Sequence, residues 1–347
     1  MASLCCNKLG KGSLGQVILV KQKTTGVKYA MKAIRKPLAI DDDMRDQIID
    51  KRHLLLRLNH PFIASLQFSF QSKANLFFVF DYLEGGTLKS LIQKEGKLSE
   101  ERAKFILAEL ILGLEYLHQN DVVCADLTSQ NILFDSNKNI KLTDFSSTRL
   151  LFKQDESDYI TSSIQYMAPE SVKDDNPTYC SDWWTLGIIF YEMIFGDLPY
   201  SSSELSAVLK QITNDEIVIP SSSCSDEARD LMGKLLQKDP QERLGNVDSS
   251  YIMGHSFFKD VNWYKVMKRQ TKTDYLSPPS EGSDIYKSTG PSNPETILIS
   301  EEVKYSQASK FQNLKLTVEG FSYDGDSALA CSDCSSSPKK SSLASEN

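Results

Sequence analysis

Cys124–Leu133 has the sequence C-A-D-L-T-S-Q-N-I-L, and Asp144–Ser146, which follows a short apolar segment, has the sequence D-F-S. In the first stretch Asp126 can orient and deprotonate a hydroxyl group. The side-chain oxygens of Asn131 and Asp144 can hold Mg²⁺ against a nucleotide. An acid, an amide five residues later and a second acid after a strand are typical of a site for metal-bound phosphates. The rest of the chain is therefore interpreted around this site.

The composition is that of a soluble globular protein, with 40% hydrophobic and 24% charged residues. The 347 residues exceed one average domain but fit a two-lobed unit with a tail. A net charge of −7 argues against nucleic acid or an anionic membrane as the main partner. The longest apolar run, Leu186–Phe195, is too short to span a bilayer, and the N-terminus has no signal region. Seven cysteines without framework spacing indicate reduced thiols in a cytoplasmic or nuclear protein.

A glycine-rich segment, Gly10–Gly15, has the pattern G-x-G-x-x-G. The pattern alone is weak, because a dinucleotide-binding fold would also need a helix after it. Here apolar residues follow and the chain turns at Thr24–Gly26, so we expect two antiparallel strands around a glycine flap that approaches phosphates. Lys32, on the next strand, would bind those phosphates as a point charge, although taken singly it would be an exposed strand lysine. The strand entering the flap, 3–9, is short, which indicates a missing upstream part.

Apolar periodicity predicts helices over 41–59 and 100–119, and strands over 65–70, 75–80 and 140–142. The sequence therefore predicts an α+β fold in which a small antiparallel sheet with one helix precedes a mostly helical part.

Four later segments occur in an order that completes the pattern. They are Tyr166–Glu170 (Y-M-A-P-E), Asp182–Gly187 (D-W-W-T-L-G), Asp239–Gly245 (D-P-Q-E-R-L-G) and His255–Trp263 (H-S-F-F-K-D-V-N-W). With the flap, Lys32 and the loop at Asp126, they make the chain resemble the AGC class of serine/threonine protein kinases, of the RSK and protein-kinase-C type. The resemblance covers about residues 3–323.

This resemblance implies a bilobal protein-kinase fold over 3–258, with an N-lobe at 3–83 and a C-lobe at 84–258. An extended C-terminal tail would follow at 259–323, and a disordered Ser-rich tail at 324–347. The segment Val318–Tyr323 (V-E-G-F-S-Y) resembles the hydrophobic motif that docks back on the small lobe. Val318 replaces an aromatic residue, so docking would be weaker, and Ser322 stands at the phosphorylatable position.

The resemblance also implies roles for particular residues. Asp126, Lys32 and Asn131 would be catalytic, Asn131 and Asp144 would bind Mg²⁺, and ATP would be the second cofactor. The nucleotide would lie against Leu9, Gly10, Lys11, Gly12, Ser13, Gly15, Val17, Ala30, Lys32, Asp81, Leu83 and Leu133. Phe80 would stand at the back of the pocket, and Thr87 replaces an acid that contacts the ribose.

Several positions depart from the family pattern. Ala125 replaces the Arg before the catalytic Asp, and Thr128 replaces a Lys that helps neutralise the transferred phosphoryl group. Ser146 replaces a pivot glycine, which has more freedom in φ. Tyr159 stands where an activating Thr is expected, whereas Ser163 remains at the position that faces the catalytic Asp.

The helix over 41–59 lacks the Glu that kinases pair with the strand lysine. The family register puts Lys51 there, and a Lys would repel Lys32. Asp50 is one residue away and is either a shorter, weaker partner for Lys32 or a solvent-facing acid. Both interpretations of Asp50 are compatible with the sequence.

Three other residues are assigned to structure. Arg243 is the expected ion-pair partner of Glu170, Asp182 is expected to hold the catalytic loop, and His118 is interpreted as a core histidine.

The function expected from the resemblance is transfer of the ATP γ-phosphate to Ser or Thr of a protein substrate, with reduced activity. An upstream kinase acting on the activation segment or Ser322 would be a further partner. The alternative is a pseudokinase, a kinase-fold scaffold or allosteric partner that binds ATP weakly or not at all. The missing Glu, Arg and Lys favour the alternative, and the presence of Lys32, Asp126, Asn131 and Asp144 opposes it.

Overall fold

The structure, a computed structural model, describes residues 3–12, 15–22, 24–36, 42–72, 74–144, 163–174, 177–200, 202, 204–220, 224–271, 318 and 321–322. Our predictions for Ser13, Ser146 and Tyr159, and for 272–317 and 324–347 of the tail, lie outside these residues.

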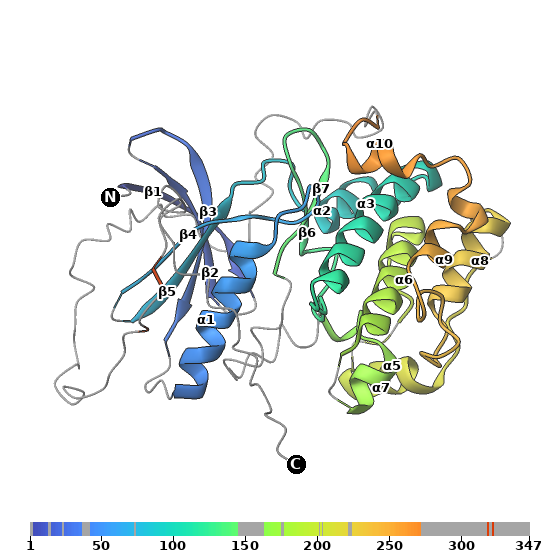
Figure 1. The fold of residues 1–347 in the computed structure, drawn as a ribbon. Helices are drawn as coiled ribbons and strands as arrows, with labels where there is room; N and C mark the ends of the chain where they lie inside the picture. Colours follow the sequence, from blue (N-terminus) through green and yellow to red (C-terminus); the bar gives the residue numbers. More distant parts are fainter. Residues whose placement is uncertain are drawn as a thin grey trace, which may run out of the picture.

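The small lobe is a five-stranded antiparallel sheet with the order β1-β2-β3-β5-β4. Its strands are β1 (Ser3–Gly12), β2 (Gly15–Lys21), β3 (Lys28–Arg35), β4 (Leu66–Gln71) and β5 (Asn75–Asp81). The helix α1 (Asp42–Arg57) lies beside the sheet, with two acidic residues in its first turn as its macrodipole favours (Figure 1). The predicted sheet with a single helix is confirmed.

The glycine flap is a hairpin between β1 and β2. Gly12 pairs with Gly15, and no helix follows, so a dinucleotide-binding fold is excluded for this segment. β1 runs three residues past the predicted strand, and its ladder shifts register between Ser3 and Asn7 and between Lys8 and Gly10. These irregularities agree with the poor strand character of this stretch.

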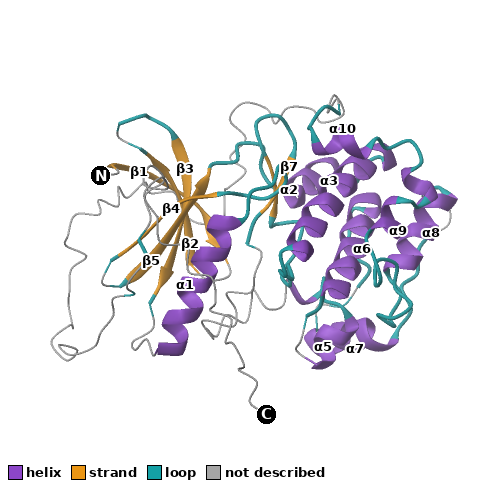
Figure 2. Cartoon of the chain, viewed as in Figure 1, coloured by secondary structure: helices purple, strands orange, loops and turns teal. Residues whose placement is uncertain are grey.

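The large lobe is mostly helical, and its elements follow one another from α2 to α10 (Figure 2). They are α2 (Leu88–Glu95), α3 (Glu100–Gln119), β6 (Ile132–Phe134), β7 (Ile140–Leu142), α5 (Pro169–Asp174), α6 (Tyr179–Phe195), α7 (Leu205–Asn214), α8 (Asp226–Leu235), α9 (Ser250–Met253), the 3₁₀ helix η2 (Ser256–Phe258) and α10 (Trp263–Met267). Helix α6 is buried along nearly its whole length, as its almost unbroken apolar sequence predicts.

The connector between the lobes docks on the hairpin of β6 and β7. The backbone N–H of Gly85 donates to the carbonyl of Phe134 at 2.9 Å, and the N–H of Phe134 donates to the carbonyl of Gly86 at 2.9 Å. A Cβ at Gly85 would lie 2.5 Å from the Cβ of Phe134, so only glycine allows this approach. The two lobes are thus joined directly beside the catalytic loop.

The described part of the tail returns to the small lobe. Val318 and Phe321 are fully buried, and the ring of Phe321 packs edge-on against Phe78 of β5 with centroids 5.2 Å apart. The Gln71 side chain donates to the Val318 carbonyl at 2.6 Å, and the Ser69 hydroxyl donates to the Phe321 carbonyl at 2.6 Å. The described residues of this segment thus contact β4 and β5 of the small lobe, and Figure 1 shows them in red beside the sheet. No helix among the described residues is long and apolar enough to cross a membrane.

Candidate active site

The catalytic loop lies between α3 and β6 and is held by Asp182 from α6. Its carboxylate accepts the backbone N–H of Cys124 at 2.8 Å and that of Ala125 at 3.1 Å. Asp182 is 1% exposed, and the ring of His118 contacts it at 2.8 Å. Because Ala125 has a φ of 58°, its backbone is in a region that costs about 1–3 kcal/mol for a residue other than glycine. These bonds hold Ala125 in that conformation, and the predicted structural role of Asp182 is confirmed.

Asn131 joins the two ends of the loop. Its side-chain N–H donates to the Asp126 carbonyl at 2.7 Å, which turns the amide oxygen to the opposite side of the amide group. The Asn131 carbonyl accepts the backbone N–H of Thr143 at 3.0 Å and its hydroxyl at 2.9 Å. Asn131 therefore links Asp126, through its side chain, to Thr143, the residue before Asp144, through its carbonyl.

The two lobes meet chemically in an ion pair between the Lys32 ammonium and the Asp144 carboxylate. The side chains are 9% and 24% exposed. Burial opposes ionisation of Asp144, but the charge and hydrogen bond of Lys32, together with the charge of Lys51, outweigh it and hold the pKa of Asp144 below its usual value. Asp144 itself has a φ of 58°, so its backbone is also in an unfavourable region.

Lys51 of α1 contributes to the same electrostatic environment. The pKa of Lys51 is lowered to about 7, mainly by burial and also by the charge of Lys32, against the charge of Asp144, which raises it. Asp50 is exposed. The hypothesis that Asp50 is the partner of Lys32 is therefore wrong, because Asp50 faces solvent while Lys51 faces the site.

The remaining predicted nucleotide-binding residues come from both lobes. In the small lobe, β1 carries Leu9, Gly10, Lys11 and Gly12, β2 carries Gly15 and Val17, and β3 carries Ala30 and Lys32. Asp81 is the last residue of β5, and Leu83 follows that strand. In the large lobe, β6 carries Leu133. Val17 pairs with Lys32 in the β2–β3 ladder, and Ala30 pairs with Phe80 in the β3–β5 ladder. On the other lobe, Leu133 bridges to Thr87.

Thr87 has a local structural role that the sequence analysis missed. It is the N-cap of α2: its hydroxyl accepts the Ser90 N–H at 3.0 Å, and the Ser90 hydroxyl caps the Thr87 N–H at 3.2 Å. The signal was a Thr-x-x-Ser sequence directly before an apolar helix. Thr87 is therefore used in folding the connector, whatever its effect on a ribose.

The sequence also did not reveal a buried carboxylate that contacts the catalytic loop. Glu192 of α6 is 0% exposed and pairs with the Lys89 ammonium at 2.7 Å. The Tyr166 hydroxyl donates to Glu192 at 2.7 Å, and the Ser129 hydroxyl donates to it at 3.2 Å. The network links α2, the catalytic loop and the segment before α5. Sequence could not reveal it, because its members are far apart along the chain.

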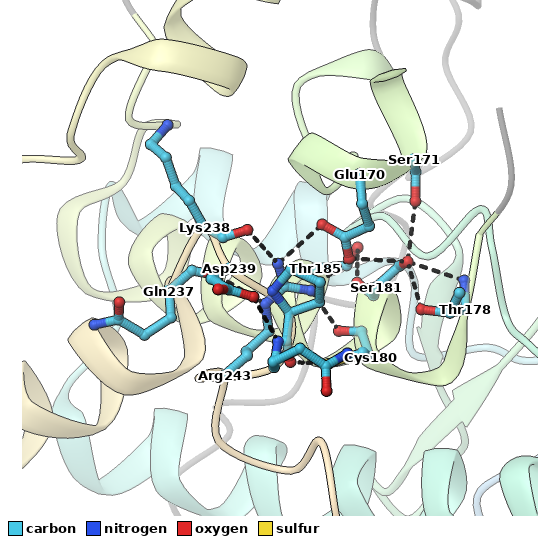
Figure 3. A network of polar contacts seen from close by, with 12 residues as sticks. Glu170, Ser171, Thr178, Cys180, Ser181, Thr185, Gln237, Lys238, Asp239 and Arg243 are labelled. Atoms are coloured by element: carbon cyan, nitrogen blue, oxygen red, sulfur yellow. Dashed lines mark hydrogen bonds and ion pairs between the residues drawn. The ribbon is translucent and has the colours of Figure 1, made fainter. Parts of the chain in front are cut away.

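The ion pair predicted between Glu170 and Arg243 is confirmed (Figure 3). The two guanidinium nitrogens of Arg243 donate to the two Glu170 oxygens at 2.5 and 2.9 Å. The carbonyls of Cys180 and Gln237 accept further N–H groups of Arg243 at 2.9 Å each. This site joins the start of α5 to the segment after α8 and to the first turn of α6.

The donor set of the loop fits Mg²⁺. Asp144 supplies a carboxylate and Asn131 an amide oxygen, the hard oxygen ligands that Mg²⁺ takes alongside substrate phosphates. No cluster of three or more His, Cys, Asp or Glu that could hold a metal occurs among the described residues. A metal held by two protein ligands and phosphate oxygens needs no such cluster.

A flap-bearing sheet, a helical lobe and an oxygen-ligand loop between them define a two-lobed phosphotransfer fold. Residues 5–258 match the protein kinase domain, and the chain therefore belongs to the protein kinase family, within the AGC group of serine/threonine kinases. It is 38% identical over 269 residues to the RAC-beta serine/threonine-protein kinase of Homo sapiens, covering 76% of this chain and 55% of that protein. It is 35% identical over 283 residues to the human ribosomal protein S6 kinase alpha-6, covering 80% and 38%.

A third relative is the serine/threonine-protein kinase YPK1 of Saccharomyces cerevisiae, 38% identical over 262 residues, covering 75% of this chain and 38% of that protein. The chain thus spans about half or less of the length of these relatives.

Proposed function

We propose that this chain is an ATP-dependent serine/threonine protein kinase that phosphorylates protein hydroxyl groups at a reduced rate. The observation that carries the proposal is the ion pair between Lys32 of the small lobe and Asp144 of the large lobe. It brings a phosphate-binding cation and a metal-binding carboxylate together beside the loop that carries Asp126 and Asn131.

In the proposed reaction, the oxygen of a substrate Ser or Thr forms a bond to the γ-phosphorus of ATP. The bond between that phosphorus and the bridging oxygen of ADP breaks, and the hydroxyl proton passes to the Asp126 carboxylate. Lys32 leaves Asp144 to bind phosphate oxygens. Mg²⁺, held by Asn131 and Asp144, neutralises charge on the phosphates when bound.

The reduced rate follows from two missing positive charges. Ala125 and Thr128 stand at positions where the family has Arg and Lys, and Thr128 is 5% exposed and uncharged. Loss of one electrostatic contact to a transition state typically costs about 10²–10³ in rate. Against a kinase kcat of about 1–100 s⁻¹, a slow enzyme would remain.

The decisive test compares phosphotransfer by the wild type and Asp126→Asn under identical purification. We expect the variant to lose about 10²-fold or more of the rate, since it cannot accept the substrate proton. Asp260→Asn, which changes an exposed acid outside the site, is the matched control and should keep wild-type activity. Equal rates for wild type and Asp126→Asn would mean that the signal comes from a contaminating kinase.

A second candidate is a pseudokinase scaffold that binds nucleotide weakly or not at all. It is favoured by Lys51 in the register of the family's helix Glu and by Ala125 and Thr128 at the positions of its Arg and Lys. A ligand that binds only the folded state raises its melting temperature. Failure of MgATP to raise the melting temperature of the purified chain would therefore favour the scaffold.

The partners of the proposed kinase are a protein substrate carrying Ser or Thr and an upstream kinase, in the cytoplasm or nucleus. Ser322 is a candidate site for the upstream kinase, because its side chain is exposed while its carbonyl accepts Arg52 at 3.5 Å. A phosphate at Ser322 would lie near the Arg52 cation, which favours binding. Mass spectrometry of the chain from cells, with Ser322→Ala as the control, tests this site.

A further inference from the structure

Lys51 lies on the face of α1 that turns toward the protein. The buried residues of α1 are Ile48, Arg52 and Leu55. Residues three and four apart in a helix share one face, so Lys51 lies on the same side as Ile48 and Leu55. Its side chain is half-buried, whereas that of Asp50, one position earlier, is exposed. Lys51 therefore points inward, not into solvent.

The charged groups that act on Lys51 are those of the nucleotide site. Lys32 and Asp144 both shift the pKa of Lys51, and Lys51 in turn stabilises the Asp144 carboxylate. On the same face of α1 as Lys51, Ile48 and Leu55 belong to one buried cluster with Ile34 and Phe78 of the sheet. Ile34 lies two residues from Lys32 on the same face of β3, and Phe78 pairs with Lys32. The face of α1 that carries Lys51 is therefore turned toward Lys32. Lys51 thus adds a second positive charge on the side of the sheet that carries Lys32.

We propose that Lys51 is a second phosphate-binding residue, which contacts the phosphate oxygens of a nucleotide together with Lys32. The inference rests on the proposed ATP site and adds a residue to it. With Asp144 holding Mg²⁺, its carboxylate would no longer be available to pair with either ammonium group. The phosphates then supply the negative charge that two half-buried or buried cations require.

A phosphate-binding Lys51 differs from what the kinase pattern would lead one to expect at this position. A Glu in this register would pair with Lys32, so a Lys there would be expected only to weaken the site. If Lys51 binds phosphate, restoring a Glu places a negative charge against the phosphates. The two views therefore predict opposite effects for the same substitution.

The test measures dissociation constants of the full chain for MgATP, ADP and adenosine by calorimetry. We expect Lys51→Met to weaken MgATP and ADP binding by roughly 10-fold or more, the usual effect of losing one hydrogen bond to a charged group. Lys51→Glu should weaken it further. Adenosine, which carries no phosphate, should bind all variants equally. Arg57→Met removes an exposed cation from the same helix and is the control that should leave all three constants unchanged.

Lys51→Arg and Lys51→Gln guard against a folding defect, with thermal melts of the ligand-free chains as the check. Arg keeps the charge and should retain most of the affinity, whereas Gln should resemble Met. The inference is overturned if Lys51→Met binds MgATP like the wild type or if Lys51→Glu binds it more tightly. In either case the wild type still binds MgATP, and the proposed kinase function stands. If the wild type binds neither MgATP nor ADP, both the function and the inference fail.

Discussion

Two ion pairs of this protein differ in their contacts and in their neighbouring charges. Lys32–Asp144 joins the two lobes, whereas Glu170–Arg243 lies within the large lobe. Arg243 is 2% exposed and contacts both oxygens of Glu170 and two backbone carbonyls (Figure 3). Lys32 contacts one oxygen of Asp144, whose side chain is 24% exposed. The first pair has further hydrogen bonds that satisfy its donors, while the second has a neighbouring cation, Lys51.

This difference separates a structural interaction from an exchangeable one. A buried pair with additional hydrogen bonds is costly to break, because the remaining charge has no other partner. Lys32 and Asp144 make a single contact, and Asp144 has Lys51 as a second cation, so opening the pair leaves the carboxylate with a neighbouring positive charge. The large-lobe pair therefore stabilises the fold, and the pair between the lobes can open for a nucleotide and a metal.

The largest effect on stability is expected from Arg243→Ala. The variant should lose about 3–5 kcal/mol of unfolding free energy, because the Glu170 carboxylate is left without its cation. Chemical denaturation measures this loss. Arg229→Ala, which removes the 2.8 Å surface pair with Asp226, is the control and should cost under about 1 kcal/mol. Similar losses of unfolding free energy in the two variants would show that the Glu170–Arg243 pair stabilises the fold no more than a surface ion pair does.

Phe321→Ala tests how far the small lobe depends on the tail. Phe321 is 0% exposed and packs on Phe78, so its truncation should cost about 3 kcal/mol, as for other buried aromatic residues. Ser322→Ala changes an exposed neighbouring side chain and should have little effect. A melting temperature that Phe321→Ala leaves unchanged would show that the tail does not stabilise the lobe.

Glu109→Gln tests a buried acid of the large lobe that has a backbone partner. Burial raises the pKa of Glu109 to about 8, and its carboxyl accepts the Ile140 N–H at 2.8 Å. Since the folded state keeps a proton that the unfolded state releases above its pKa of 4.5, stability falls as pH rises from about 4.5 to 8. Between pH 5 and 8 the wild type should lose at least about 1.4 kcal/mol more than Glu109→Gln, the free energy of one pKa unit. Parallel pH profiles would contradict the shift.

The smallest effect on stability is expected from Lys32→Met. It should change the unfolding free energy by about 1 kcal/mol, less than Arg243→Ala, because the pair has a single contact and the charge of Lys51 still stabilises the Asp144 carboxylate. The same variant should lose the thermal stabilisation by MgATP. Lys28→Met, at the exposed start of β3, should keep it. A destabilisation as large as that of Arg243→Ala would mean that the Lys32–Asp144 pair is structural too.

Much of the candidate site could be predicted from sequence because its residues form short local patterns. The flap hairpin, the order of Asp126 and Asn131 in one loop and the placement of Asp144 after a strand each depend on neighbouring residues. The inward register of Lys51 was also correct, because helical periodicity assigns faces over a few residues. The role of Asp50 was not settled by sequence, since one position of register decides whether an acid is exposed.

The contacts that sequence could not predict join residues distant in the chain. Lys89 and Glu192, and Arg52 and the Ser322 carbonyl, belong to elements whose relative positions depend on packing of the whole lobe. The direct pairing of Lys32 with Asp144 is of the same kind. Sequence predicted that one would bind phosphate and the other metal, but not that they bind each other.

By itself, the sequence determined which groups are available: a glycine flap, a lysine, two acids and an amide, without the positive charges at Ala125 and Thr128. Only the tertiary structure decided their electrostatic environment. Helix packing turned Lys51 toward Lys32 and Asp144 and left Asp50 in solvent. The physical reason is that local patterns select side chains and faces, whereas burial and the proximity of distant charges arise only when the two lobes come together.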